Sequence, residues 1–231
     1  MSASIVLTGL AANDPVPGEY VEVAFAQGPS SLATGTDRVL IIGGLLTTGA
    51  GSASVVYGPD TAIPMLTADD AKLLFGAGSE IHRMVRRFMS MNTTTPVYAI
   101  GVAENAAGVA ATGTITVATT ATAAGTLRIY VQDEFVEVGF VTGDTPTTIA
   151  ANAVIQINAK DYWPVTAANV AGVITITSKQ KGPRANLIRY FGRIIPFTGV
   201  GTTVSPTTST LTASGAGIDD LTAALAVVVA Q

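Results

Sequence analysis

Residues 38–46 read RVLIIGGLL, a continuous apolar run that carries glycines toward its end. Apolar residues without polar alternation are typical of a strand buried on both faces, as in a parallel sheet. Downstream, Thr67 supplies a helix-capping hydroxyl, and Asp69 and Asp70 follow it at the positive end of the helix dipole. We therefore predict a buried strand followed by a helix that ends at the glycines of residues 76–78.

A second helix is predicted to begin after Ser79. Its apolar residues recur at positions i, i+3, i+4 and i+7, and these are Ile81, Met84, Val85 and Phe88. Pro96 then leads into another apolar run, residues 97–102, which we expect to be a strand. The order of strand, helices and strand favours an α/β layer with parallel strands.

The texture of the sequence changes at about residue 104. Short segments rich in β-branched residues follow one another between turns: GTITV, TLRIYV, FVEVGF and GVITIT. One helix is predicted among them, in TTIAANAVIQINA, with Ile149, Ala153 and Ile157 on one face. These segments predict a separate, small β-rich domain over residues 105–200.

The remaining segments complete the predicted organisation. Residues 1–20, with the apolar patch Ile5, Val6 and Leu7 and two prolines, are expected to form an extended arm. Residues 21–104 are the first part of the α/β core, 201–217 a Thr/Ser/Gly linker, and 218–231 the return to that core. The predicted fold is an α/β core, incomplete in this chain, with an inserted small β-rich (α+β) domain. We expect the chain to be part of a longer polypeptide.

Composition narrows the function. Charged residues make up 12% of the chain, about half the usual share, and the net charge is −4. Such a surface is poorly protected against association, so we expect neighbours to cover it. The lack of basic excess argues against nucleic acid, and the absence of cysteine excludes thiol catalysis and disulfides. Without a secretory signal or an 18-residue apolar run, a soluble protein made in a cytoplasm is expected.

The segment 78–91, GSEIHRMVRRFMSM, holds the only histidine of the chain beside three arginines. His82, Arg83, Arg86 and Arg87 fall off the apolar stripe, which is typical of a solvated helix face. Two alternatives stay open: docking of this face on an acidic surface of another subunit, and an anion or catalytic site. A Ser-His-Asp hydrolase has no G-x-S-x-G motif to hold its nucleophile here, so we expect no enzyme.

No other motif predicts chemistry. One histidine without cysteine and without a D-x-D-x-D-G loop gives no metal site, and neither nucleotide-binding glycine motif is present, so no cofactor is expected. The glycines of IIGGLLTTGAG are explained by a tight turn and close packing. Asp219 and Asp220, like Asp69 and Asp70, are assigned to a helix start. The basic residues Lys179, Lys181 and Arg184 are expected in a solvated loop, with intersubunit contact as the second possibility.

Several phrases together resemble one family. The segment LLFGAGSEIHRMVRRFMSMNTTTPVYAIGV is similar to a stretch of contractile phage tail sheath proteins of the Mu-like or myovirus type. The segments from GVAATGTITV to GVITITSKQKGPRANLI resemble the β-rich insert of that family. Its K-G-x-x-x-N-x-I phrase falls on Lys181, Gly182, Asn186 and Ile188, and its glycine-rich return falls on residues 214–217. The similarity runs from about residue 38 to 225, and its order and spacing are fairly specific.

The resemblance implies a subunit that stacks in hexameric rings around a tail tube, within the virion and beside baseplate and terminator proteins. It also implies a subtilisin-like core without a protease triad, a C-terminal half beyond this chain, and arms that add strands to neighbouring sheets. Ile5, Val6 and Leu7 suit such an arm, and Arg83, Arg86 and Arg87 suit an intersubunit surface. The rival readings are a tail tube or baseplate protein, a β-rich adhesin, and an α/β enzyme with an unrecognised site.

Overall fold

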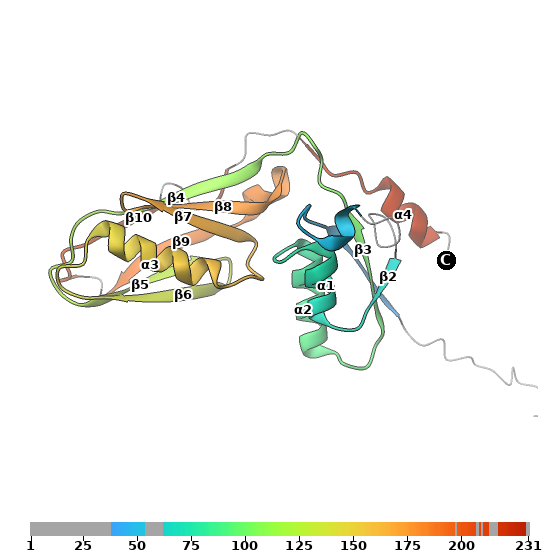
Figure 1. The fold of residues 1–231 in the computed structure, drawn as a ribbon, viewed down its shortest axis with the longest axis horizontal. Coiled ribbons are helices and arrows are strands. Elements are labelled where there is room, and N and C mark those ends of the chain that lie inside the picture. The colour runs from blue at the N-terminus through green and yellow to red at the C-terminus, as the bar shows by residue number, and fades with distance from the viewer. Residues whose placement is uncertain are drawn as a thin grey trace, which may run out of the picture. The chain divides into compact units, whose positions relative to one another are not determined.

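A computed structural model describes residues 38–53, 62–196, 198–206, 208, 210–212 and 217–229 (Figure 1). The predicted arm at 1–20 lies outside these residues. The described chain mixes helices with strands, so its class is α+β. We call residues 38–102 together with 217–229 the α/β part, and residues 110–212 the β-rich part.

The α/β part contains a three-stranded sheet in the order β1-β3-β2. Strands β1 (Val39–Gly44) and β3 (Val97–Val102) are parallel, as predicted, and β2 (Ala62–Met65) pairs with β3 in the antiparallel sense. The expectation that β1 is buried on both faces was wrong for its first four residues, which are only partly buried. In the described sheet β1 is an edge strand, and the centrally placed β3 is the buried one.

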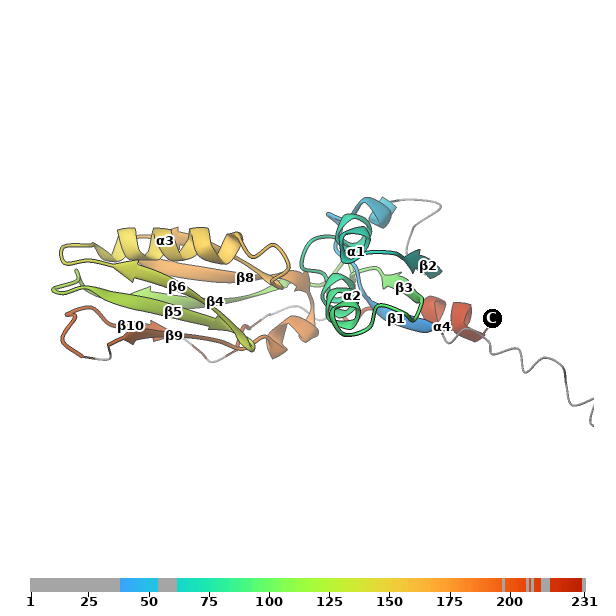
Figure 2. The same ribbon diagram turned by 90° about the horizontal axis from the view of Figure 1, so that it is seen from below.

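Helices cover this sheet on both faces. Helices α1 (Ala68–Phe75) and α2 (Glu80–Met91) pack on one face, in a core that includes Phe75, Ile81 and Val85. Helix α4 (Thr222–Val229) packs on the other face, where Ala224 meets Ile100 and Val102 (Figure 2). A short 3-10 helix, η2 (Ala50–Ala53), follows β1.

The predicted helix starts are confirmed. The Thr67 hydroxyl accepts from the Asp70 N–H at 3.1 Å, and the Asp70 carboxylate accepts from the Thr67 N–H at 2.8 Å, which is a capping box. The Ser79 hydroxyl accepts from the backbone N–H of His82 at 3.1 Å. Between the helices, Gly76 and Gly78 adopt positive φ angles of 91° and 85°, which side chains disfavour. The sequence between 67 and 80 therefore sets both the length of α1 and the start of α2.

The β-rich part contains two antiparallel sheets and one long helix. Sheet order β10-β4-β8-β7 joins β4 (Ala110–Val117), β7 (Val165–Val170), β8 (Val173–Lys181) and β10 (Val204–Pro206). Sheet order β6-β5-β9 joins β5 (Gly125–Val131), β6 (Glu134–Phe140) and β9 (Tyr190–Ile195). Helix α3 (Pro146–Asn158) lies along these strands in Figure 2 and buries Ile149, Ala153 and Ile157 in their core, as predicted.

The interval 201–217 is more than the linker that was predicted. It contains β10, and Thr210 and Thr212 form bridges to Arg189 and Thr112. Threonine-rich sequence is compatible with edge strands as well as with loops, because threonine is β-branched. Part of this interval therefore belongs to the β-rich part.

Candidate functional site

Polar side chains join the α/β part to the β-rich part along helix α2. We call this set of contacts the seam. On the α/β side its members are Lys72, Glu80, Arg83, Arg86 and Asp219; on the β-rich side they are Gln132, Asp161, Tyr162, Lys179 and Arg184.

Arg184 occupies one end of the seam. Gly182, with a φ of 85°, and Pro183 start the short helix η3 (Pro183–Leu187) that carries it. The two terminal nitrogens of its guanidinium bind different carboxylates, Glu80 at 2.6 Å and Asp219 at 2.7 Å. Glu80 also accepts from the Gly44 N–H at 3.0 Å. One arginine of the β-rich part thus links helix α2, the end of β1 and the segment before α4.

The two places where the chain passes between the parts lie side by side at this end. The Asn105 N–H donates to the Asp219 carboxylate at 2.8 Å, and the Asn105 amide donates to the Ile218 carbonyl at 3.0 Å. The Asp219 side chain is 9% exposed, so its charge depends on these partners. Nearby, burial raises the pKa of Glu104, which accepts from the Lys181 N–H.

Lysines form the other end of the seam. Lys179, at the end of β8, donates to the carbonyls of Ala77 at 3.1 Å and Asp161 at 2.6 Å. Burial lowers the pKa of Lys179. Lys72 of α1 pairs with the Asp161 carboxylate at 2.5 Å, and this hydrogen bond raises the pKa of Lys72 and lowers that of Asp161.

The middle of the seam rests on arginines of α2. Arg83 donates to the Gln132 side chain at 2.5 Å, and burial lowers the pKa of its guanidinium. The Arg86 guanidinium lies 3.7 Å from the centre of the Tyr162 ring, within the range of a cation–π contact. Tyr162 and Trp163 both donate to Glu134, at 2.6 and 2.9 Å. Burial acts to raise the pKa of Glu134, but these hydrogen bonds hold it below its usual value.

His82 is not on a solvated face, so that expectation was wrong. Its side chain is 3% exposed, and its Nδ1 accepts from the Gly78 N–H at 3.0 Å. Burial lowers the pKa of the ring. The helical-wheel argument assumed one covered face, whereas α2 packs on the sheet with one face and meets the β-rich part with the next. The predicted solvated loop was also wrong for Lys179, which lies in β8. Arg184 is exposed as predicted but forms two ion pairs, and Asp219 binds Arg184 rather than a helix end.

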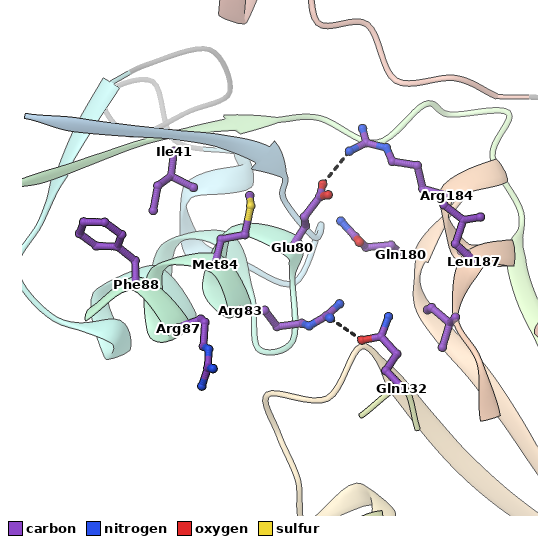
Figure 3. A pocket seen from close by; sticks show the side chains of 12 residues that line it. Ile41, Glu80, Arg83, Met84, Arg87, Phe88, Gln132, Gln180, Arg184 and Leu187 are labelled. Carbon is purple, nitrogen blue, oxygen red and sulfur yellow. Dashed lines mark hydrogen bonds and ion pairs between the residues drawn. The ribbon is translucent and has the colours of Figure 1, made fainter. Parts of the chain in front are cut away.

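A cavity of about 680 Å³ opens beside the seam (Figure 3). Apolar side chains line its floor, among them Ile41, Met84 and Phe88, and Leu187 stands at its margin with 76% exposure. Glu80, Arg83 and Arg184 lie at the end nearest the β-rich part, where the dashed contacts cross it. The residues that line this cavity include no serine, threonine, tyrosine or lysine, and the buried His82 is not among them. Within the described ranges, no group of three or more histidines or carboxylates is placed to hold a metal ion.

The structure describes only some of the predicted interface residues. Ile5, Val6 and Leu7 lie outside the described residues. Arg83 and Arg86 make the contacts given above within their own chain, and Arg87 is exposed. An intersubunit role for the three arginines stays a prediction. Sequence reasoning missed Glu80, Asp161 and Tyr162; each is a common surface residue type, and no local pattern marks a contact with a distant segment.

Comparison with known proteins shows which family the sequence resembles. The chain is 31% identical over 173 residues to the Mu-like prophage FluMu tail sheath protein of Haemophilus influenzae. The resemblance to phage tail sheath proteins is confirmed. The aligned residues make up 75% of this chain and 34% of the relative, so the chain spans about a third of the sheath protein that it matches. No family model matches the chain.

A structural comparison adds little. The D2–D3 domains of the flagellar cap protein from Serratia marcescens match 50% of this chain and 80% of their own, with 17% identity and a TM-score of 0.22. A similarity at that level supports no conclusion about fold or function. In the part of the chain that the structure describes, no helix is both long enough and apolar enough to cross a membrane.

Proposed function

We propose that this protein is a structural subunit of a contractile tail sheath. Subunits stack as hexameric rings around a tail tube in the virion, and contraction of the stack drives the tube through the host envelope. The observation that carries the proposal is the 31% identity over 173 residues to a tail sheath protein. Its partners are further copies of itself, the tube, and the baseplate and terminator proteins, and assembly takes place in the host cytoplasm.

The proposed arrangement is an α/β core into which residues 105–200 are inserted. The side-by-side passage of the chain at Asn105 and Asp219 supports this, because an insert leaves its host at one point and returns near it. The proposal assigns no enzymatic role. Ile5, Val6 and Leu7 are proposed to join a neighbour's sheet by strand addition, and Arg83, Arg86 and Arg87 to face a neighbouring subunit.

The seam suits a subunit that moves as a body. Contraction in such assemblies repacks whole subunits, and a domain that swings freely would absorb the displacement instead of passing it on. Arg184 and Lys179 each contact partners on the other side of the seam. Two anchored ends limit rotation of the β-rich part about either one. The free energy that each subunit releases on contraction can be small, because many subunits contract together.

Immunogold electron microscopy of native particles distinguishes this proposal from the alternative functions. An antibody to this chain should decorate the full length of extended tails, and in contracted tails it should follow the short, wide shell and leave the bare tube unlabelled. Label on the bare tube would identify a tube protein instead. Label confined to the tail tip would identify a baseplate protein, and label away from tails would favour an adhesin.

A further inference from the structure

The outer face of sheet β6-β5-β9 carries an aromatic row. Strand register places Phe135, Tyr130 and Phe191 side by side across the three strands. The rings of Tyr130 and Phe135 are 5.5 Å apart between centroids, and Phe135 and Phe191 remain 46% and 48% exposed. The chain has only 14 aromatic residues in all. Three of them standing in one row on a surface therefore need an explanation other than core packing.

A second row of charged residues lies beside the first. The register aligns Glu137, Arg128 and Arg193, and Arg128 pairs with Glu137, its Nε 2.7 Å from the carboxylate. The Arg128 guanidinium lies over the Phe135 ring at 4.4 Å. The Nε of Arg193 is buried without a hydrogen-bond partner among the described residues. Tyrosine, phenylalanine and arginine held together in this way are typical of the energetic centre of a protein interface.

The opposite sheet of the β-rich part provides a contrast. On the outer face of sheet β10-β4-β8-β7, the register aligns Thr112, Thr177 and Thr166. The next rows hold small residues and valines, including Val170, which is 73% exposed. No aromatic side chain stands in these rows within the described strands, and the charged Lys179, near the end of β8 on this face, is engaged in the seam. The middle of this face is therefore neutral, and only the other face carries aromatic anchor residues.

Charge indicates what the aromatic face would meet. On the strands of this face, Arg128 and Arg193 outnumber Glu137 and give a net charge of +1. The whole chain carries −4, so the rest of each copy carries −5. A second copy thus offers the opposite charge outside this face. A basic face and an acidic remainder on one molecule favour head-to-tail contact, which propagates instead of closing as a dimer.

We propose that the outer face of sheet β6-β5-β9, anchored by Tyr130, Phe135 and Phe191, docks on an acidic surface of a neighbouring copy of this chain. The inference rests on the proposed function, since it names a contact between subunits of the assembly. Desolvation of the aromatic row supplies affinity, and the arginines set orientation and partner choice.

Sedimentation of the purified chain over a range of concentrations, at low and high salt, tests this docking. The paired variant Phe135→Ser with Phe191→Ser should raise the concentration needed for assembly by roughly tenfold or more. Arg193→Glu should raise it further at low salt than at high salt, because screening weakens the lost attraction. The matched control, Ala168→Ser with Val170→Ser on the opposite sheet, should leave the threshold within about twofold of wild type.

Both paired variants should keep the circular dichroism spectrum and melting temperature of the wild type, since the altered side chains are partly or largely exposed. A threshold unchanged by the Phe135→Ser and Phe191→Ser pair would overturn the docking face and leave the sheath proposal standing. Wild-type chain that stays monomeric throughout would also overturn it. Failure of the sheath proposal has a separate signature, which is immunogold label away from the tail shell.

Discussion

Arg184 and Glu80 are 104 residues apart in the sequence, yet a guanidinium nitrogen of one lies 2.6 Å from a carboxylate oxygen of the other. The same guanidinium holds Asp219 at 2.7 Å, so a single side chain links the β-rich part to two separate segments of the α/β part. The contribution of the seam to stability can therefore be measured by replacing this one arginine.

Arg184→Ala is expected to lower the free energy of unfolding by about 1–2 kcal/mol. This lies between the small value of an exposed pair and the larger cost of leaving a buried charge alone, since Arg184 is 40% exposed and Asp219 only 9%. Urea denaturation measures it. Arg87→Ala, which removes an exposed arginine with no ion pair among the described residues, is the control and should change stability by less than about 0.5 kcal/mol. Equal effects would mean that the bridge contributes nothing.

The two parts are expected to unfold together in the wild type. Trp163, the only tryptophan and 2% exposed, reports on the β-rich part by fluorescence, while far-ultraviolet circular dichroism follows helices of both parts. The two transitions should coincide. In Arg184→Ala combined with Lys179→Met they should separate, because both ends of the seam are then cut. Coincident transitions in that variant would show that packing, and not the polar seam, couples the parts.

His82 predicts a pH dependence of stability. Burial holds its folded pKa below the ordinary 6.5, so the unfolded chain takes up the proton first and acid favours unfolding. The stabilising contribution is complete above about pH 6.5 and declines as pH falls toward the lowered folded pKa. His82→Asn keeps an acceptor for the Gly78 N–H and has no proton to gain, so its stability should fall less between pH 7.5 and 5.5. Glu104, with its raised pKa, acts in the opposite direction in both proteins.

Two glycines predict opposite effects of the same substitution. A Cβ on Gly49 would stand 2.4 Å from the Leu74 carbonyl oxygen and 2.6 Å from the Gly76 nitrogen, both backbone atoms that cannot step aside. Gly49→Ala should therefore cost about 1–3 kcal/mol. A Cβ on Gly139, in strand β6, meets nothing within 4 Å, and Gly139→Ala should gain up to about 1 kcal/mol. Thermal denaturation compares them, and a neutral Gly49→Ala would contradict the close approach of α1 to that loop.

Local sequence patterns predicted much of this fold, but they did not predict contacts between segments that are distant in the sequence. Thr67 and Ser79 marked helix starts because a cap needs only its next three residues. The alternation in β5 and the face of Ile149, Ala153 and Ile157 were equally readable, since periodicity is a property of one element. The burial of His82 was not, because it depends on a second partner for α2. Nor was the pairing of Arg184 with Glu80, which required knowing that η3 comes back to the start of α2.

Asn105 and Asp219 meet where the chain leaves the α/β part and returns to it, and this has a consequence for how such proteins diversify. An inserted domain whose two chain ends lie next to each other can change in size without moving the segments that it joins. Strands of the β-rich part can be lengthened, trimmed or exchanged over evolutionary time while β3 and α4 keep their places. The sequences of relatives of this chain are therefore expected to agree most in the α/β part and to differ most between Asn105 and Asp219.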